Sequence, residues 1–459
     1  MAAAAGAVRP ASKPNILLII TDQQTVQAMS AAGNPYLRTP AMDRIAREGT
    51  RFANSWCTSP VCSPARASLI TGCMPHTARV DYLGQRLNPA VPTLGEIFRD
   101  AGYETAWAGK WHLPTGLPGA QVPEGGPIPA DQRGFQFLPL ANKERAQLPF
   151  GDFMDTPIAE SAAAFLRQKH ERPFVLGVSL YNPHDICYWI AEQLPAGHSA
   201  SGYAVPRERD LPPLPPNFAR SADEPEFISR CRLGRYFGAE TSPAKNWDEL
   251  RWRQYLYVYY RLTEQVDRQV AIVLEALRHA RLDENTIVVF TSDHGEGMAA
   301  HQWVMKLMLY QEPLSVPLVF RWKGHIPQNR VNHRALVSGM DVLPTLCDLA
   351  GITLPQLVHG VSLRRSLDGA ADPPRDSVFA HLAPEMKDKS MQGRAVRTER
   401  FKYVAFSWGR NPEMLFDLEA DPGETRNLVS SGAARRELER ARALLDRWIK
   451  ETRDNWKSA

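Results

Sequence analysis

A cysteine stands at the start of a helical pattern in the segment VCSPARASLITG, residues 61–72. Ser63 is expected to cap this helix, with the proline that follows it as the first helical residue. Cys62 then lies just ahead of a helix N-terminus, where the helix dipole and free N–H groups favour an anion, and Arg66 can face the same point. The pattern fits either a buried thiol beside a capped helix or a nucleophile placed to receive an anionic group.

Polar side chains follow two apolar runs that are typical of buried strands. Asp22 and Gln23 come directly after NILLIIT, and Asp293 and His294 come directly after TIVVFTS. In a parallel sheet these points lie at one edge, where such folds bind ligands. Each residue alone is more often a turn or helix cap, so the prediction depends on several strand ends converging. Two carboxylates, an amide and an imidazole there suit Ca²⁺ or Mg²⁺ better than zinc.

Basic groups follow two more of the apolar runs. Lys110 and His112 come after TAWAG, and His184 comes after FVLGVSLYNP. At the same sheet edge they would place positive charge beside the carboxylates. Each of them alone is equally compatible with a structural role.

The elements that must position these residues alternate along the chain. Apolar runs without polar alternation predict buried strands at 15–21, 105–109, 174–180, 286–291 and 316–320. Amphipathic patterns predict helices at 40–49, 92–101, 250–280 and 341–350. This order indicates an α/β fold with a large, mostly parallel sheet sandwiched by helices.

The pattern changes after about residue 370. Short strands are predicted at 378–382, 393–398 and 403–406, followed by a helix at 435–450. We therefore expect two units: a main domain over residues 13–370, and a small C-terminal antiparallel α+β subdomain over residues 371–459. The Pro-rich and Arg-rich residues 191–247 are interpreted as a long ordered loop over the main domain, not as a linker.

Composition limits the partners and the compartment. A net charge of +4 from 54 basic and 50 acidic residues gives no reason to expect nucleic acid or a membrane as a partner. The six cysteines form no CxxC pair, which predicts thiols instead of a disulfide scaffold or zinc knuckle. The first 14 residues lack the apolar core of a secretory signal, so the sequence as written predicts a cytoplasmic protein. An export signal removed upstream would make it periplasmic or secreted, and the oligomeric state is left open.

The motif around the cysteine resembles a family signature. Cys62-Ser63-Pro64-Ala65-Arg66, followed by SLITG, resembles the signature of the type I sulfatases, which are formylglycine-dependent members of the alkaline phosphatase-like superfamily. Other segments resemble the family's remaining motifs in the same order: PNILLIITDQQ, AGKWH, NPHD, and FTSDHGE with His301 and Lys306. Together they span about residues 14–350, and RTERFKYV and LFDLEADPGETRNL resemble the family's terminal subdomain.

The resemblance implies a mechanism for the cysteine. In this family a maturation enzyme reads Cys-x-Pro-x-Arg and oxidises the cysteine to Cα-formylglycine, whose aldehyde is hydrated to a diol. One hydroxyl, activated by the metal, attacks sulfur and displaces the alcohol. The second hydroxyl then loses its proton and sulfate is released. A thiol or serine would lack that second hydroxyl.

The resemblance also implies a cation site. Its ligands would be Asp22, Gln23, residue 62, Asp293 and His294, and Ca²⁺ is expected, with Mg²⁺ or Mn²⁺ as alternatives. Many sulfatases have Asp in place of Gln23 and Asn in place of His294. These two departures lower the ligand charge by one.

The remaining motif residues would handle the sulfate. Arg66 would orient the diol at position 62, and Lys110 and Lys306 would hold sulfate oxygens where the transition state spreads negative charge. His112 would act as a base in the aldehyde–diol step. His184 is the first choice for general acid at the leaving oxygen and a substrate contact, with Lys306 as the alternative acid. His301 is either a substrate-pocket residue or a helix-cap partner.

Three functions remain under comparison. The main one is hydrolysis of a sulfate ester, with a sulfated carbohydrate or an aryl sulfate as substrate. Phosphonate monoester or phosphodiester hydrolysis on the same fold is the alternative, because some relatives with that activity also pair Asp with Gln and Asp with His. A metal-stabilised binding protein without catalysis is a third, and the intact Cys62 and Arg66 argue against it.

Overall fold

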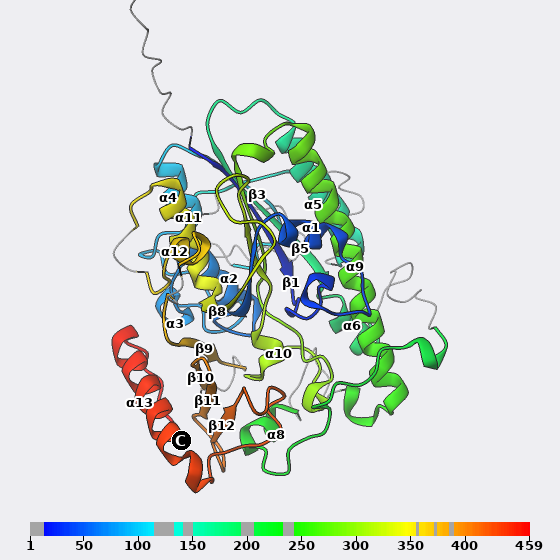
Figure 1. The fold of residues 1–459 in the computed structure, drawn as a ribbon, viewed down its shortest axis with the longest axis vertical. Coiled ribbons are helices and arrows are strands. Elements are labelled where there is room, and N and C mark those ends of the chain that lie inside the picture. The colour runs from blue at the N-terminus through cyan, green and yellow to red at the C-terminus, as the bar shows by residue number, and fades with distance from the viewer. Residues whose placement is uncertain are drawn as a thin grey trace, which may run out of the picture.

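The main unit is built around an eight-stranded sheet. The computed structural model describes residues 13–113, 133–140, 150–193, 206–232, 243–354, 358–370, 374–384 and 390–459. The strands are β1 (Asn15–Asp22), β2 (Thr50–Trp56), β3 (Glu104–Gly109), β4 (Gln136–Phe137), β5 (Phe174–Pro183), β6 (Thr286–Ser292), β7 (Leu318–Arg321) and β8 (Arg330–Ser338). Their order is β4-β3-β5-β1-β6-β7-β2-β8 (Figure 1). Among these strands only β7 runs antiparallel to its neighbours, so the prediction of a mostly parallel sheet is confirmed.

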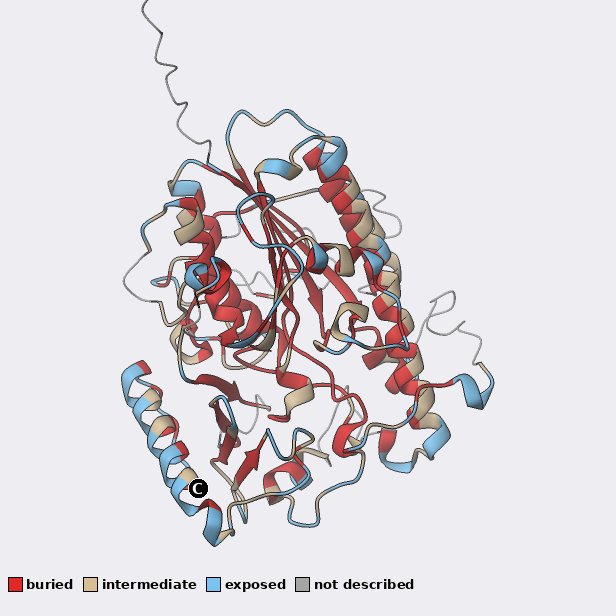
Figure 2. Ribbon diagram, in the orientation of Figure 1, coloured by how far each residue is buried: buried red, intermediate tan, exposed pale blue. Residues whose placement is uncertain are grey.

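Helices cover both faces of this sheet. The helices described up to residue 370 are α1 (Pro40–Arg47), α2 (Cys62–Thr71), α3 (Pro75–Ala78), α4 (Leu94–Asp100), α5 (Gly151–Leu166), α6 (Ile186–Ile190), α8 (Glu226–Arg232), α9 (Glu249–His279), α10 (Gln311–Leu314), α11 (Val342–Ala350) and α12 (Arg364–Leu367). In β1, Ile16 and Leu18 join a core with α2, α4 and α11, whereas Leu17 and Ile19 join a core with α1, α5 and α9. Figure 2 shows the resulting sandwich, with the strands buried between the two helical layers. Burial on both faces explains why the central strands are continuously apolar.

Two of the helices, α4 and α9, have local start signals. In α4, Thr93 and Glu96 form a capping box, and in α9 the carboxylate of Asp248 accepts from the backbone N–H of Arg251. The prediction that Ser63 caps helix α2 is wrong. Helix α2 begins at Cys62, its N-cap Val61 makes no side-chain cap, and the Ser63 hydroxyl donates to a backbone oxygen of another segment. Cys62 therefore lies in the first turn of the helix.

A smaller four-stranded antiparallel sheet follows the main unit. Its strands are β9 (Val378–Leu382), β10 (Gly393–Arg397), β11 (Phe401–Phe406) and β12 (Glu413–Asp417), in the order β12-β11-β10-β9. Helix α13 (Arg435–Thr452) packs on it through Leu438 and Leu445, which share a core with Val396 and Tyr403. The other face packs against the main unit through a second core. The predicted small α+β unit is therefore present, and its boundary at 370/371 stays a prediction.

The segment between β5 and α9 differs in part from its predicted position. Residues 194–205 and 233–242 of the predicted loop lie outside the described residues. Within the described part, Phe227 of α8 stacks on Phe406 of the small sheet, with ring centroids 4.3 Å apart. This part of the segment therefore packs on the C-terminal unit as well as on the main unit. No described helix is both long and apolar enough to cross a membrane.

Candidate active site

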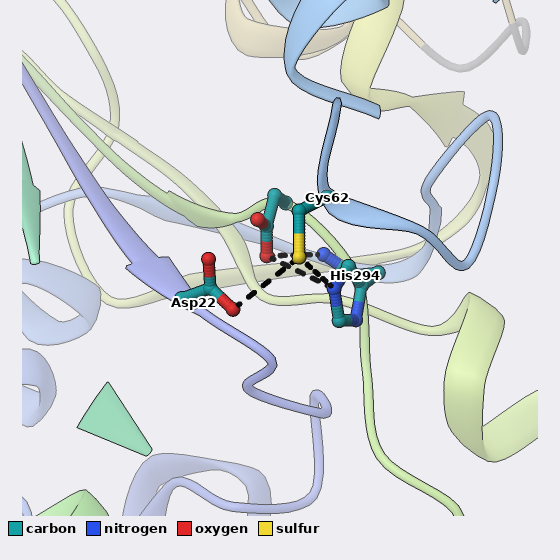
Figure 3. A group of neighbouring side chains, drawn as sticks. Asp22, Cys62 and His294 are labelled. Carbon is teal, nitrogen blue, oxygen red and sulfur yellow. Dashed lines mark hydrogen bonds and ion pairs between the residues drawn. The ribbon is translucent and has the colours of Figure 1, made fainter. Parts of the chain in front are cut away.

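Two neighbouring strands and one helix bring the predicted ligands together. β1 and β6 pair in parallel with Thr21 opposite Ser292, so Asp22 and Asp293, which follow these two residues, come to the same sheet edge. Helix α2 presents Cys62 to this edge. Ligand atoms of Asp22, Cys62, Asp293 and His294 all lie within 4.8 Å of one another, and all four residues are buried (Figure 3). The predicted convergence is confirmed for these four residues.

The sulfur of Cys62 is surrounded by polar atoms. It lies 3.8 Å from Oδ1 of Asp22, 3.2 Å from Nε2 of His294 and 3.0 Å from Nζ of Lys306. Burial and Asp22 act to raise the pKa of the thiol, but Lys306, His294 and Lys110 together lower it well below its ordinary value. Position 62 is therefore a place where a negative charge is stabilised.

Arg66 joins the two carboxylates. Its guanidinium donates to Oδ2 of Asp22 at 2.9 Å and to Oδ2 of Asp293 at 2.8 Å. It also donates to the backbone oxygen of Lys110 and to the hydroxyl of Ser179. Arg66 therefore holds in place the two carboxylates that face position 62. Its contact with a diol at position 62 stays a prediction.

The buried carboxylates and cations shift one another's pKa values. Burial acts to raise the pKa of Asp22, but Lys110, His184 and Arg66 hold it well below its ordinary value. Burial and Asp22 raise the pKa of Asp293. Lys110 lies 2.8 Å from Asp22, and its pKa is raised despite burial because Asp22 and the Cys62 sulfur are near. Asp22 and Lys110 are therefore both charged.

Two further cationic or imidazole groups face the same point. Lys306 keeps a raised pKa despite burial, mainly because of Cys62. His184 is buried, and burial followed by Lys110 and Lys306 lowers its pKa well below the ordinary value. Among the described residues, the buried Nδ1 of His184 has no hydrogen-bond partner. The lowered pKa favours the neutral imidazole of His184.

His112 contacts the start of helix α2. Its backbone adopts a positive φ of 54°, and its carbonyl oxygen accepts a hydrogen bond of 2.6 Å from the hydroxyl of Ser63. This hydrogen bond ties the Lys110–His112 loop to α2. Within the described part of the chain, the buried Nδ1 of His112 has no hydrogen-bond partner.

His301 belongs to a different cluster. Its ring stacks on Tyr310 with centroids 4.0 Å apart, and one of its ring nitrogens lies within 4.8 Å of carboxylate oxygens of Glu312 and Glu424. The structure does not place it among the ligands around Cys62, and its role in substrate binding stays a prediction.

Gln23 is held by residues that the sequence analysis did not single out. Its side-chain nitrogen donates to Glu296 at 2.5 Å and lies 3.0 Å from the sulfur of Cys187, while its backbone N–H donates to Asp293. Glu296 also accepts hydrogen bonds from Tyr255 and from a backbone N–H. In this arrangement the Gln23 amide points to Glu296, and its role as a metal ligand stays a prediction. In the sequence, Glu296 could have been noticed as an acidic residue two positions after His294.

The remaining donors fit a hard divalent cation. Arg66 and Lys110 hold Oδ2 of Asp22, which leaves Oδ1 directed toward Cys62. Asp293 and His294 add a carboxylate and an imidazole at the same point. Carboxylate-rich ligation of this kind suits Ca²⁺, Mg²⁺ or Mn²⁺.

The comparison with protein families agrees with this geometry. The sulfatase family model matches residues 14–352, which include every residue of the site. The protein belongs to the sulfatase family. The model for the C-terminal part of N-sulphoglucosamine sulphohydrolase matches residues 299–451 of this sulfatase. The resemblance predicted from the motifs and the alkaline phosphatase-like fold are confirmed, and the protein is a sulfuric ester hydrolase.

Individual relatives cover the whole chain. A Δ4,5-hexuronate-2-O-sulfatase of Bacteroides thetaiotaomicron is 33% identical over 100% of this chain and 93% of its own length. The solved structure of a 2-O GAG sulfatase matches with a TM-score of 0.82 and 31% identity over 98% of this sulfatase and 95% of that chain. A phosphonate monoester hydrolase of Agrobacterium radiobacter has a TM-score of 0.78 at 24% identity, over 96% and 95% of the two chains, which is a likeness of fold.

Proposed function

We propose that this sulfatase hydrolyses the sulfate ester of a sulfated carbohydrate, with Cys62 converted to Cα-formylglycine and Ca²⁺ bound beside it. The observation that carries the proposal is the position of Cys62. Its sulfur lies against Asp22 and His294 on one side and against the ammonium group of Lys306 on another. A cation and an anionic substrate group can therefore meet at this one atom.

The modified residue and the cation would supply the attacking oxygen and lower its pKa. Asp22, Asp293 and His294 are the side chains that would hold the cation. Arg66 keeps the two carboxylates in place, because it donates to one oxygen of each. A maturation enzyme that reads Cys62, Pro64 and Arg66 is the partner that the proposal requires.

Lys110 and Lys306 would bind the sulfate oxygens. Both are buried and charged, and the field of each reaches Cys62. Because their charges are fixed before substrate arrives, they stabilise negative charge on the sulfuryl oxygens without reorganisation.

His184 would donate the proton to the leaving oxygen. In the free protein burial and the two lysines keep it neutral. A bound sulfate group would offset the lysine charges and raise the pKa of His184, so that it carries a proton only when substrate is present. His112, next to the Ser63 contact, would serve as the base that acts on position 62.

The proposed substrate class comes from the relatives. The 33% identical relative acts on a 2-O-sulfated unsaturated hexuronate, and a further relative is an ulvan-active sulfatase, 29% identical over 97% of this chain. A 2-O-sulfated hexuronate is therefore the first substrate to test. Phosphonate monoester hydrolysis is the second candidate, favoured by the pairing of Asp22 with Gln23 and of Asp293 with His294 in the sequence.

A comparison of kcat/KM on four substrates tests the proposal. The panel is a 2-O-sulfated unsaturated uronyl disaccharide, N-acetylglucosamine 6-sulfate, an aryl sulfate and an aryl phosphonate, with Cys62→Ala protein as the background control. We expect one of the two sulfated saccharides to give the highest value. Faster turnover of the aryl phosphonate than of every sulfate would overturn the proposal.

A further inference from the structure

A second group of potential metal ligands lies outside the active site. Donor atoms of His76, His381 and Asp454 lie within 4.8 Å of one another. His76 is in α3, which follows the nucleophile helix, whereas His381 is in β9 and Asp454 follows α13. Three elements from two parts of the fold therefore meet at one point, and the proposed reaction uses none of these residues.

His76 presents a lone pair to this point. Its Nε2 lies 3.1 Å from the backbone oxygen of Thr452, and because a carbonyl only accepts, Nε2 must carry the proton. Nδ1 is then the unprotonated nitrogen. It is buried without a hydrogen-bond partner, 3.6 Å from Oδ2 of Asp454. An imidazole fixed through one nitrogen with the other left bare is the arrangement that metal-binding histidines adopt.

His381 is the least satisfied residue of the group. It is only 1% exposed, and its ring nitrogens have no side-chain hydrogen-bond partner among the described residues. Its Nε2 lies 3.5 Å from Oδ1 of Asp81, an oxygen that is also buried and without a hydrogen-bond partner. Leaving such groups unpaired costs about 1–3 kcal/mol each, so their juxtaposition points to a missing partner.

The separations fit one metal ion. In a tetrahedral zinc site with bonds near 2.1 Å, neighbouring ligand atoms are about 3.4 Å apart. The His76–Asp454 separation of 3.6 Å is close to that value, and the donor atoms of His76, His381 and Asp454 all lie within 4.8 Å of one another. Imidazole nitrogens with carboxylate oxygens are a donor set that zinc accepts.

The surrounding charges are compatible with a cation. Arg394 donates to both oxygens of Asp454, at 2.6 and 2.9 Å, and so orients this carboxylate. Burial and then Arg394 lower the pKa of His381 well below its ordinary value, while the backbone of Asp81 opposes this effect. Neutral imidazoles are the form that binds metal. The charged groups at this point are Asp81, Asp454 and Arg394.

A cavity of about 430 Å³, lined in part by Asp81, Arg394 and Trp456, lies beside this cluster.

We propose that His76, His381 and Asp454 bind a Zn²⁺ ion that fastens the C-terminal unit to α3. A water would complete the tetrahedral shell of these three protein ligands, and the ion would link α3, β9 and the chain after α13. Binding to the folded state alone would stabilise the protein by mass action.

Zinc titration of the full-length protein tests this proposal. The protein is stripped with a chelator and saturated with Ca²⁺ to occupy the active site, and Zn²⁺ binding and the Tm are then measured. We expect one zinc per chain and a higher Tm for the wild type, for the exposed control His279→Gln and for the active-site variant Asp293→Asn. In His381→Gln and His76→Gln, zinc affinity should fall at least tenfold. Equal affinity in these two variants, or no zinc uptake by the wild type, would overturn the proposal.

A direct measurement covers the case in which the variants do not fold. Crystals of the wild type soaked in Zn²⁺ should give an anomalous scattering peak at the zinc edge between His76, His381 and Asp454. A peak only at the Cys62 site, or none, would show that the His381–Asp81 contact is an ion pair without metal, and would contradict the proposal.

Discussion

The sulfur of Cys62 lies 3.0 Å from the ammonium nitrogen of Lys306, although the two residues are 244 positions apart in the sequence. Both are buried, and each stabilises the charged form of the other. A buried ammonium group needs such a partner, because its transfer from water is costly. This pair therefore marks a point at which the protein stabilises negative charge.

Replacing the nucleophile should abolish turnover without unfolding the protein. Cys62→Ala removes the only atom that the proposed chemistry modifies, so hydrolysis of any sulfate ester should fall to background. Circular dichroism and the Tm should stay close to those of the wild type. Cys347→Ala, a buried thiol in α11, is the matched control and should retain activity. Residual turnover by Cys62→Ala would contradict the role of position 62.

Removing Arg66 should destabilise the apo protein. Arg66→Ala leaves Asp22 and Asp293 buried without their shared cation, which costs about 3–5 kcal/mol in the free energy of unfolding. Ca²⁺ should restore part of this loss, because the ion supplies positive charge to the same carboxylates. Urea unfolding with and without Ca²⁺ measures both effects. An Arg66→Ala protein as stable as the wild type without metal would argue against this account of the site.

Neutralising one carboxylate should remove the cation. Asp293→Asn keeps the shape of the side chain but loses its charge, so metal content after dialysis and kcat/KM should both fall sharply. Elemental analysis and assays on the same samples test this expectation. Full activity in a metal-free sample would refute the role of Asp293.

The leaving group should determine how much His184 matters. A poor leaving alcohol, such as a sugar hydroxyl, needs a proton in the transition state, whereas a nitrophenolate does not. His184→Gln should therefore lower kcat/KM for a saccharide sulfate by about 10²–10⁴ and affect an activated aryl sulfate much less. Equal losses on the two substrates would exclude His184 as the general acid and favour Lys306.

The stability of the protein should respond to the ionisation of Glu312. Burial and then Glu424 raise the pKa of this carboxyl from 4.5 to about 7. The folded state therefore prefers the protonated form, and stability is lost as pH rises from about 4.5 to about 7. Glu312→Gln cannot ionise, so its stability relative to the wild type should increase by up to about 3 kcal/mol across this window. Urea unfolding at both ends of the window, with the exposed Glu171→Gln as control, measures the change; a difference independent of pH would contradict it.

The sequence predicted the central strands well and the outer elements less well. β1, β5 and β6 are buried on both faces, so their apolar runs were recognisable. No prediction was made for β2 and β8, which carry polar residues and lie toward one end of the sheet. Helix α5 was missed as well, because Pro157 lies inside it and breaks the helical pattern.

The sequence predicted those site residues that come directly after a strand. Asp22 and Asp293 come together as expected because parallel register brings the ends of β1 and β6 to one edge, and the N-terminus of α2 brings Cys62 to the same point. The environment of Gln23 could not be predicted, since its backbone adopts a positive φ of 66° that turns the amide toward Glu296. The His76–His381 cluster depends on how the C-terminal unit packs, which no local pattern specifies.

Mass spectrometry of the tryptic peptide over residues 52–66 tests the central claim most directly. Cleavage after Arg51 and Arg66 gives one peptide that contains both Cys57 and Cys62, so Cys57 serves as an internal control for thiol chemistry. In protein from a host with a maturation enzyme, we predict an aldehyde at position 62 and an unmodified thiol at position 57. A thiol at both positions, with no aldehyde fraction, would contradict the account.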